Sequence, residues 1–346
     1  MNLESPDTME MGNQQSAATE IQNEQAKRVV SQNLAEDLDE EELNEVSSQC
    51  KEGFEEDRQS RSDWETNIDE WINLAKQVKE EKTYPWPGAS NVKYPLVSTA
   101  AMQFAARSYP SLVPSNRKVV NSVVIGRDPT GEKYEKAQRV SLYMSYQLMH
   151  DMKGWEEDMD KMLMMLPVVG TMFKKTWYDK TEDKIKSKVV LPKNIVVNYW
   201  TTCLEEAERV SEIIYMSRRM LKEKQNMGIY LDIDLGEPQG SGDLMPADAQ
   251  QNTGSVPYTL IEQHTFLDLD DDGYPEPYIV TFEHNSGKVL RISRRYNLDD
   301  VVMKDNGKDI AKITPINMYT KFGFIPNPDG SFYDIGFGVL LGPINE

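Results

Sequence analysis

Apolar residues begin to recur at helical spacing just after residue 60. The series comprises Trp64, Ile68, Trp71, Ile72 and Ala75. Separations of three and four residues place these side chains on one face of an α-helix, so we expect a helix over residues 62–82. Two prolines and a Pro-Gly turn follow at residues 84–91 and cannot continue that helix. The alanine-rich stretch 96–108 predicts a second, closely packed helix that ends before Tyr109-Pro110, as the residue preceding proline requires.

The next part of the chain mixes helical and strand patterns. Its β-branched runs predict strands, whereas a long amphipathic stretch and a methionine-rich stretch predict helices. The expected elements are a strand at 119–125, helices at 132–152 and 155–166, a hairpin of strands at 171–178 and 185–191, and a further strand at 194–199. Pro167 and Gly170 should break the methionine-rich helix. Its methionines fit a core and a subunit interface equally well, because flexible thioethers fill irregular gaps.

Strand patterns dominate the C-terminal part. Residues 209–216 predict a strand, and Ser217 then stands as the N-cap of a helix that Gly228 ends. Residues 236–255 are polar and rich in turn-forming residues, which is typical of an exposed loop. Three strands separated by two tight turns should follow as a β-meander. These strands are expected at 258–267, 278–284 and 289–293, and together with the helices they predict an α+β fold.

These patterns divide the chain along its length. The expected parts are an acidic, largely disordered arm at 1–60, an α+β portion at 61–235, a flexible loop at 236–256, a β-rich portion at 257–326, and a turn with the start of a long helix at 327–346. The arm should be mobile because its polar residues offer too little apolar surface to offset the entropy of ordering. Since the sequence ends as a helix begins, we expect a truncated chain.

The charge of the chain narrows the choice of partners. Its 346 residues include 57 acidic and 38 basic side chains, which gives a formal net charge of −19. Proteins hold duplex DNA mainly through Lys and Arg, so tight DNA binding is disfavoured, whereas a surface along which DNA slides benefits from repelling phosphate. Cys50 and Cys203 form no disulfide framework, which fits a reducing cytoplasm. The sequence shows neither a secretory signal nor an apolar stretch of membrane-spanning length.

Two segments resemble ligand-binding loops, but each fails in its spacing. Residues 126–133 resemble a phosphate-binding loop, yet Glu132 stands where that loop needs its Lys, so we expect a turn with an acidic helix start. The acidic turn that begins at Asp268 matches only the first half of a calcium loop, because Ile279 stands where the bidentate Glu belongs. A simple hairpin turn is the favoured interpretation.

No residue pattern indicates catalysis. The histidines of the chain are His150, His264 and His284. None of them stands in a zinc-binding pattern, although His264 and His284 could meet across the meander, and no spacing of carboxylates singles out an acid–base pair. The sequence therefore predicts no catalytic residue, no cofactor-binding residue and no metal ligand, and we expect a protein that is not an enzyme.

The Pro-Trp-Pro-Gly segment has the features of a structural motif. Its defining residues are Trp86, Pro87, Gly88 and Asn91. Two prolines stiffen the chain on either side of the indole ring, and an Asn at this place can cap its own backbone. We expect a rigid loop in which Trp86 buries its ring against the neighbouring helices, so that Trp86→Ala would lower the free energy of unfolding by about 3 kcal/mol.

Three segments together resemble the portal proteins of tailed bacteriophages, in particular those of podovirus type. The first is Tyr84-Pro-Trp-Pro-Gly-Ala-Ser-Asn91 with the following Val-Lys-Tyr-Pro-Leu96. The second joins Leu260-Ile-Glu-Gln-His264 through the acidic turn to the strands at 277–281 and 289–291. The third, from Phe332-Tyr-Asp-Ile-Gly336 to the end of the chain, resembles the glycine-containing turn that opens a long helix in that family. The resemblance spans most of residues 60–346.

The resemblance implies a structural role. Portal proteins of this kind form a dodecameric ring at one capsid vertex, a passive channel for DNA packaging and genome ejection. The implied fold is portal-like, with a helix-rich wing and stem, β-hairpins and a β-meander. The implied partners are other copies of the chain, the terminase large subunit, and capsid, scaffolding and tail proteins, while DNA passes without tight binding and no membrane takes part. The implied location is the virion, after assembly in the host cytoplasm.

Two other functions stay open at this point. The carboxylates between Asp268 and Asp272 would serve a metal-dependent hydrolase if histidine ligands lay within reach. The same turn would otherwise stabilise a binding module by holding calcium.

Overall fold

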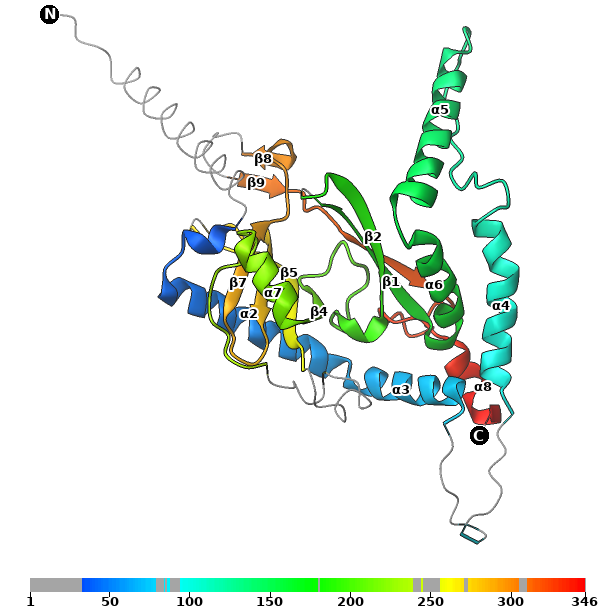
Figure 1. Cartoon of the computed structure of the whole chain (residues 1–346), viewed down its shortest axis with the longest axis horizontal. Coiled ribbons are helices and arrows are strands. Elements are labelled where there is room, and N and C mark those ends of the chain that lie inside the picture. Colours follow the sequence, from blue (N-terminus) through cyan, green and yellow to red (C-terminus); the bar gives the residue numbers. More distant parts are fainter. Residues whose placement is uncertain are drawn as a thin grey trace, which may run out of the picture. The chain divides into compact units, whose positions relative to one another are not determined.

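The computed structural model describes residues 33–78, 84, 86–87, 94–179, 181–238, 244, 256–270, 273–304 and 310–345. Its helices and antiparallel sheets confirm the expected α+β class (Figure 1). The chain divides into two compact units, each assembled from segments that lie far apart in the sequence. Unit 1 comprises Met1–Gln59, Asn194–Asn198 and Glu205–Asn317, and unit 2 comprises Ser60–Lys193, Tyr199–Leu204 and Met318–Glu346.

Unit 1 is built on an antiparallel sheet of five strands within the described residues. In sheet order these are β3 (Ile195–Val196), β4 (Val210–Met216), β5 (Tyr258–Leu267), β6 (Glu276–Glu283) and β7 (Val289–Arg294). The last three confirm the expected β-meander, and Ile261 on β5 lies opposite Phe282 on β6. Every residue of β6 is buried, so both faces of the sheet are covered at this strand.

Helices supply that cover. Helix α2 (Glu40–Ser60) contributes buried side chains to one hydrophobic cluster with Ile261, whereas α7 (Arg218–Asn226) places Leu221 in a second cluster with Leu260. Successive residues of a strand point to opposite faces, so the two helices lie on opposite faces of the sheet. The expected N-cap of α7 is confirmed, because the hydroxyl of Ser217 accepts a hydrogen bond from the Met220 N–H at 3.4 Å.

The expectation of a disordered arm through residue 60 is wrong from Asn33 onward. The Asn33 side chain donates to the Leu290 carbonyl and accepts from the Ile292 N–H, both at 3.0 Å, and so joins the edge of β7. The apolar residues that α2 buries are Val46, Cys50 and Phe54. They recur every four residues on one helix face, while the glutamates of the helix are exposed. The prediction of disorder rested on the acidic composition and overlooked these three apolar residues at helical spacing.

A small two-stranded sheet completes the described part of unit 1. It pairs β8 (Val301–Met303) with β9 (Ile310–Ile313) in antiparallel fashion. Tyr296, Ile310 and Ile313 form a separate small core beside it.

Unit 2 combines helices with an antiparallel sheet of three strands. The helices are α3 (Ser62–Lys76), α4 (Leu96–Leu112), α5 (Glu132–Tyr146) with the π-helical turn Gln147–Asp151, α6 (Trp155–Val169) and α8 (Phe337–Asn345). The strands, in sheet order, are β10 (Tyr319–Gly323), β1 (Thr171–Asp179) and β2 (Lys184–Val190). Strands β1 and β2 confirm the expected hairpin, and β10 joins it from the C-terminal part of the chain.

Two expected elements of unit 2 differ in the structure. Helix α3 ends at Lys76, six residues before the expected 82, because Gln77 adopts a left-handed conformation with φ of 54°. Residues 119–125 do not form a strand. The backbone of Val120 instead bonds to two serine hydroxyls of α5, so this β-branched run lies along a helix rather than in a sheet.

Two prolines expected to end helices lie inside them. Pro110 stands in the last turn of α4 and Pro167 in the last turn of α6. A proline removes one backbone hydrogen bond, and packing of the surrounding residues overrides that local loss. Helix α6 ends at Val169, and Gly170 follows it as the C-cap with φ of 86°.

The two units do not follow the linear division expected from composition. Strands β3 and β4 were expected with the preceding helices but join β5, whereas β10 leaves the expected β-rich portion for the sheet of unit 2. Pairing between distant strands depends on register and packing, and a change in composition along the chain does not reveal it.

Candidate functional site

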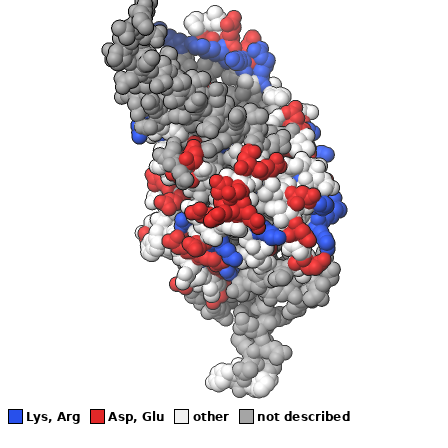
Figure 2. Space-filling model, turned by 90° about the vertical axis from the view of Figure 1, so that its left-hand side faces the viewer, with Lys and Arg blue, Asp and Glu red and all other residues white. Residues whose placement is uncertain are grey.

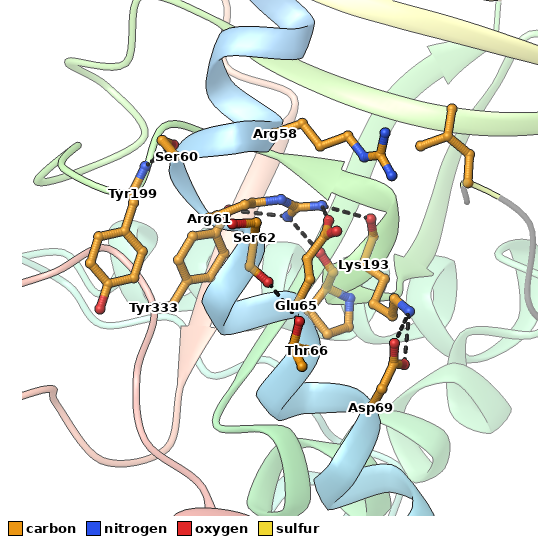
Figure 3. A network of polar contacts seen from close by, with 12 residues as sticks. Arg58, Ser60, Arg61, Ser62, Glu65, Thr66, Asp69, Lys193, Tyr199 and Tyr333 are labelled. Carbon is orange, nitrogen blue, oxygen red and sulfur yellow. Dashed lines mark hydrogen bonds and ion pairs between the residues drawn. The ribbon is translucent and has the colours of Figure 1, made fainter. Parts of the chain in front are cut away.

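Arg61 is fully buried at the start of α3 and lies at the centre of a polar network in unit 2 (Figure 3). Its guanidinium donates to the carbonyl oxygens of Pro192 at 3.2 Å and Lys193 at 2.9 Å. It also donates to the Tyr333 hydroxyl at 3.1 Å and pairs with the Glu65 carboxylate. One buried cation thus ties α3 to the loop that follows β2 and to the turn that precedes α8.

Aromatic rings surround this guanidinium. Trp64 and Tyr333 stack with their ring centroids 3.8 Å apart, and the guanidinium carbon of Arg61 lies 5.3 Å and 5.8 Å from the two centroids. A cation–π contact of this kind contributes about 0.5–2 kcal/mol. The sequence predicts a helix at Trp64 and a turn at Tyr333. No short pattern of residues indicates that the two rings stack, so the sequence analysis did not predict this contact.

Glycines hold the turn before α8 against the end of α6. A Cβ atom at Gly170 would lie 2.2 Å from the Asp334 carbonyl oxygen, and one at Gly336 would lie 2.4 Å from the Val168 carbonyl oxygen. No residue with a side chain fits at such separations. The Asp334 carboxylate also pairs with Lys321 of β10 at 2.8 Å, so the turn that precedes α8 is fixed on several sides.

Helix α8 packs on α3 through its small residues. A Cβ atom at Gly338 would lie 2.2 Å from Cγ of Trp71, whereas one at Gly342 would lie 3.5 Å from Cδ1 of Leu74. Residues four apart share a helix face, so the two glycines let the backbone of α8 approach α3 closely.

A pocket of about 660 Å³ opens beside this contact, within unit 2. Such a volume lies within the range of small-ligand sites. Its aromatic lining consists of Trp64, Trp71, Tyr199, Trp200 and Tyr333. Its acidic lining consists of Asp63, Glu70 and Asp334. Among the described residues no Lys or Arg lines it, so the pocket is both aromatic and negatively charged.

Helix α5 shows the reverse of the usual burial pattern. Its buried residues are Ser141 and Ser145, which bond to Val120 of the neighbouring chain segment. Its large apolar side chains are exposed instead. We call these exposed residues the α5 surface, which comprises Tyr134, Val140, Leu142, Tyr143, Met144 and Tyr146 of the helix with Val123 and Ile125 of the adjacent segment. Large apolar side chains left exposed along one element in this number are typical of a contact with another molecule.

The Pro-Trp-Pro-Gly segment differs from expectation where it is described. The ring of Trp86 is 64% exposed, and Pro87 is exposed as well. Gly88 and Asn91, the other residues of the expected motif, lie outside the described residues. The expected burial of Trp86 against neighbouring helices is therefore wrong for the single chain. The expected loss of about 3 kcal/mol on truncation does not apply to it either, because an exposed ring buries little area.

The loop at residues 126–131 is a capped helix start, as the sequence predicts. Gly126 and Gly131 have φ values of 89° and 78°. The Asp128 carboxylate accepts a hydrogen bond from the Tyr134 N–H at 2.9 Å. An acidic side chain of the protein thus takes the place at the helix N-terminus that an anion would favour.

The structure describes the histidines and only part of the acidic turn that were weighed as metal ligands. In the turn after β5, the Asp268 carboxylate accepts from the Gly273 N–H at 2.9 Å, while Asp271 and Asp272 lie outside the described residues. His264 lies 3.4 Å from the Glu262 carboxylate, and His284 lies 4.0 Å from that of Glu55. Within the described ranges, no three His, Cys, Asp or Glu side chains are grouped so as to hold a metal ion.

Two buried groups have shifted pKa values. Burial lowers the pKa of Lys174 to about 8, although the charge of Asp158 opposes this shift. The Lys174 ammonium lies 4.8 Å from the ring centroid of Trp155, which gives the cation a partial replacement for water. Burial raises the pKa of the Cys50 thiol to about 12, so this thiol is unreactive while α2 stays packed.

Acidic side chains cover the exposed side of α2. Figure 2 shows Asp and Glu clustered at the centre of the side on which α2 lies in Figure 1. The exposed acidic residues of α2 are Glu40, Glu41, Glu42, Glu45, Glu52, Glu55 and Glu56. The exposed side of α2 therefore repels phosphate over about one Debye length, near 10 Å.

Neither a scan against protein-family models nor a search of the curated proteins found a match. None of the helices in the described ranges has the length and hydrophobicity needed to cross a membrane.

Proposed function

We propose that this protein is a subunit of a bacteriophage portal, a dodecameric ring that provides a passive channel for DNA at one capsid vertex. The observation that carries the proposal is the α5 surface. A helix that buries two serines and exposes leucine, tyrosine and methionine is suited to an assembly in which another subunit covers it.

The magnitude of the exposure supports an assembly. Leu142 and Tyr143 are each 61% exposed, and Ile125 is 92% exposed. Apolar area removed from water contributes about 25 cal/mol per Å², so a neighbouring copy that covers these side chains would stabilise the ring by several kcal/mol per contact. In Figure 1, α5 extends away from the sheet of unit 2, which leaves this surface accessible to a neighbour.

The turn before α8 gives a second line of support. Its sequence resembles the turn that opens a long helix in portal proteins, and Tyr333, Asp334 and Gly336 are held by contacts that tolerate little change. A ring subunit needs such a fixed junction, because small errors in direction at a helix start grow along the helix.

The charge of the chain fits a conduit. A formal net charge of −19 and the cluster of Asp and Glu in Figure 2 disfavour tight DNA binding. A channel that repels phosphate lets DNA slide. In this proposal the protein is not an enzyme and has no catalytic, cofactor or metal residues. Its partners are other copies of itself, the terminase large subunit, and capsid, scaffolding and tail proteins, and its location is the virion after assembly in the host cytoplasm.

A substitution on the α5 surface tests the proposal. Leu142→Glu places a charge where a neighbouring subunit would bury an apolar side chain, so it should abolish ring formation by the full-length protein. Met220→Glu is the matched control, because Met220 is a 44% exposed apolar residue on a helix of unit 1. Oligomeric state would be measured by analytical ultracentrifugation, and folding of both variants by circular dichroism.

The proposal requires that Leu142→Glu lower the oligomeric state while Met220→Glu leaves it unchanged. A folded Leu142→Glu variant that assembles as the unaltered protein does would remove the observation on which the proposal stands.

A further inference from the structure

The acidic aromatic pocket of unit 2 has a lining that favours a cation. Asp63, Asn67 and Glu70 follow one another at four- and three-residue spacing on α3, so they share one face of that helix. In the part of the chain that the structure describes, neither Asp63 nor Glu70 has an ion-pair partner. Two exposed carboxylates thus face a pocket without a compensating positive charge.

Indole rings give the same pocket flat surfaces on which a planar group can stack. Trp200 lines the same pocket and is 79% exposed, and Trp71 lines it from α3. Tryptophan is the aromatic side chain that attracts cations most strongly through its ring face. Carboxylates and indole faces in one pocket are the combination that binds a planar cation, because a guanidinium stacks on a ring while its N–H groups bond to carboxylates.

We propose that this pocket binds an arginine side chain presented by a partner polypeptide. The volume of about 660 Å³ exceeds what one guanidinium fills, so residues on either side of the arginine find room along the groove between α3 and α8. Val339 and Leu74 offer apolar contacts to such flanking residues. The inference rests on the pocket alone and does not depend on the proposed function.

Isothermal titration calorimetry with a capped Gly-Arg-Gly tripeptide tests the inference, because calorimetry does not depend on the oligomeric state of the protein. We expect a dissociation constant of about 1 mM or tighter. The same tripeptide with citrulline in place of arginine has nearly the same shape but no charge, and it should bind at least about tenfold more weakly. N-acetyl-arginine methylamide, which lacks the flanking residues, should also bind more weakly than the tripeptide.

Charge-neutral variants assign the binding to the pocket. The double variant Asp63→Asn with Glu70→Gln should weaken tripeptide binding at least about tenfold. The control pair Glu205→Gln with Glu206→Gln removes the same charge from exposed residues outside the pocket and should leave binding unchanged. Trp200→Phe should weaken binding by a smaller factor, because phenylalanine attracts a cation less strongly than tryptophan does.

Several results would overturn the inference. The first is no heat of binding at a tripeptide concentration about tenfold above the expected dissociation constant. The second is equal affinity for the arginine and citrulline tripeptides. The third is equal weakening by the two double variants, which would indicate attraction to the net charge of the chain. Equal affinity for N-acetyl-arginine methylamide would contradict a polypeptide partner.

Discussion

Arg61→Met should destabilise unit 2 strongly while leaving unit 1 unchanged. Methionine matches the aliphatic stem of arginine, so the substitution removes the charge and the hydrogen bonds while keeping the apolar part of the side chain. The carbonyl oxygens of Pro192 and Lys193 and the hydroxyl of Tyr333 each lose a donor. Glu65 loses its counter-ion.

The contacts give the magnitude of the effect. Each buried polar group left without a partner costs about 1–3 kcal/mol, and breaking a buried ion pair costs about 3–5 kcal/mol. The Glu65 side chain is 20% exposed, so water reaches it and reduces the penalty for leaving it unpaired. We therefore expect the free energy of unfolding of unit 2 to fall by about 3 kcal/mol, toward the lower end of the range for buried ion pairs.

The distribution of chromophores lets each unit be followed separately. All six tryptophans of the chain belong to unit 2, so their fluorescence during urea unfolding reports on that unit alone. In a Cys203→Ser background, reaction of Cys50 with a thiol reagent reports on unit 1. With a urea dependence of about 2 kcal/mol per M, Arg61→Met should lower the tryptophan midpoint by about 1.5 M and leave the thiol midpoint in place.

Arg107→Met is the matched control, because Arg107 is an exposed arginine on α4 of the same unit. It should change the free energy of unfolding by no more than about 0.5 kcal/mol. A loss below about 1 kcal/mol for Arg61→Met would refute the reasoning, since the network would then contribute no more than a surface contact. Equal shifts of both midpoints would refute the assignment of the network to unit 2.

The remaining predictions concern both units. Gly338→Ala should lower the stability of unit 2 by about 1–3 kcal/mol in urea unfolding, because its Cβ would overlap a tryptophan ring, whereas Gly342→Ala should not. Cys203 should react with a thiol reagent in the native protein and Cys50 should not; equal rates would show that α2 is unpacked. Since the pKa of Lys174 is lowered to about 8, its contribution to stability should rise between about pH 8 and 10.5, and Lys174→Met should raise the melting temperature at pH 7 more than at pH 10. Calcium or EDTA should leave the melting temperature unchanged; a shift with calcium would favour the binding module.

The sequence predicted elements whose signals are local. The N-cap at Ser217, the β1–β2 hairpin and the meander of β5 to β7 each follow from a short pattern of residues. The run at 119–125 was misjudged because β-branched residues favour strands only where a partner strand exists, and here the hydroxyls of Ser141 and Ser145 satisfy Val120 instead.

The candidate site depends on contacts that no local pattern encodes. Arg61 and Tyr333 stand 272 residues apart, and the pocket beside them forms only when α8 packs on α3. The one available signal was the pair Gly338 and Gly342, whose four-residue spacing indicates a helix face that another helix approaches closely. Burial of Trp86 was predicted from its large ring and the two prolines that flank it, and such a local pattern does not say whether a ring faces the core or solvent.

Negative-stain electron microscopy of the full-length protein tests the central claim most directly, because subunits that assemble through the α5 surface into a portal form rings that are visible in single images. The proposed dodecamer predicts closed rings with about twelve-fold symmetry and a central channel at micromolar protein concentration. A field of uniform monomers at that concentration, from protein shown to be folded, would contradict the account.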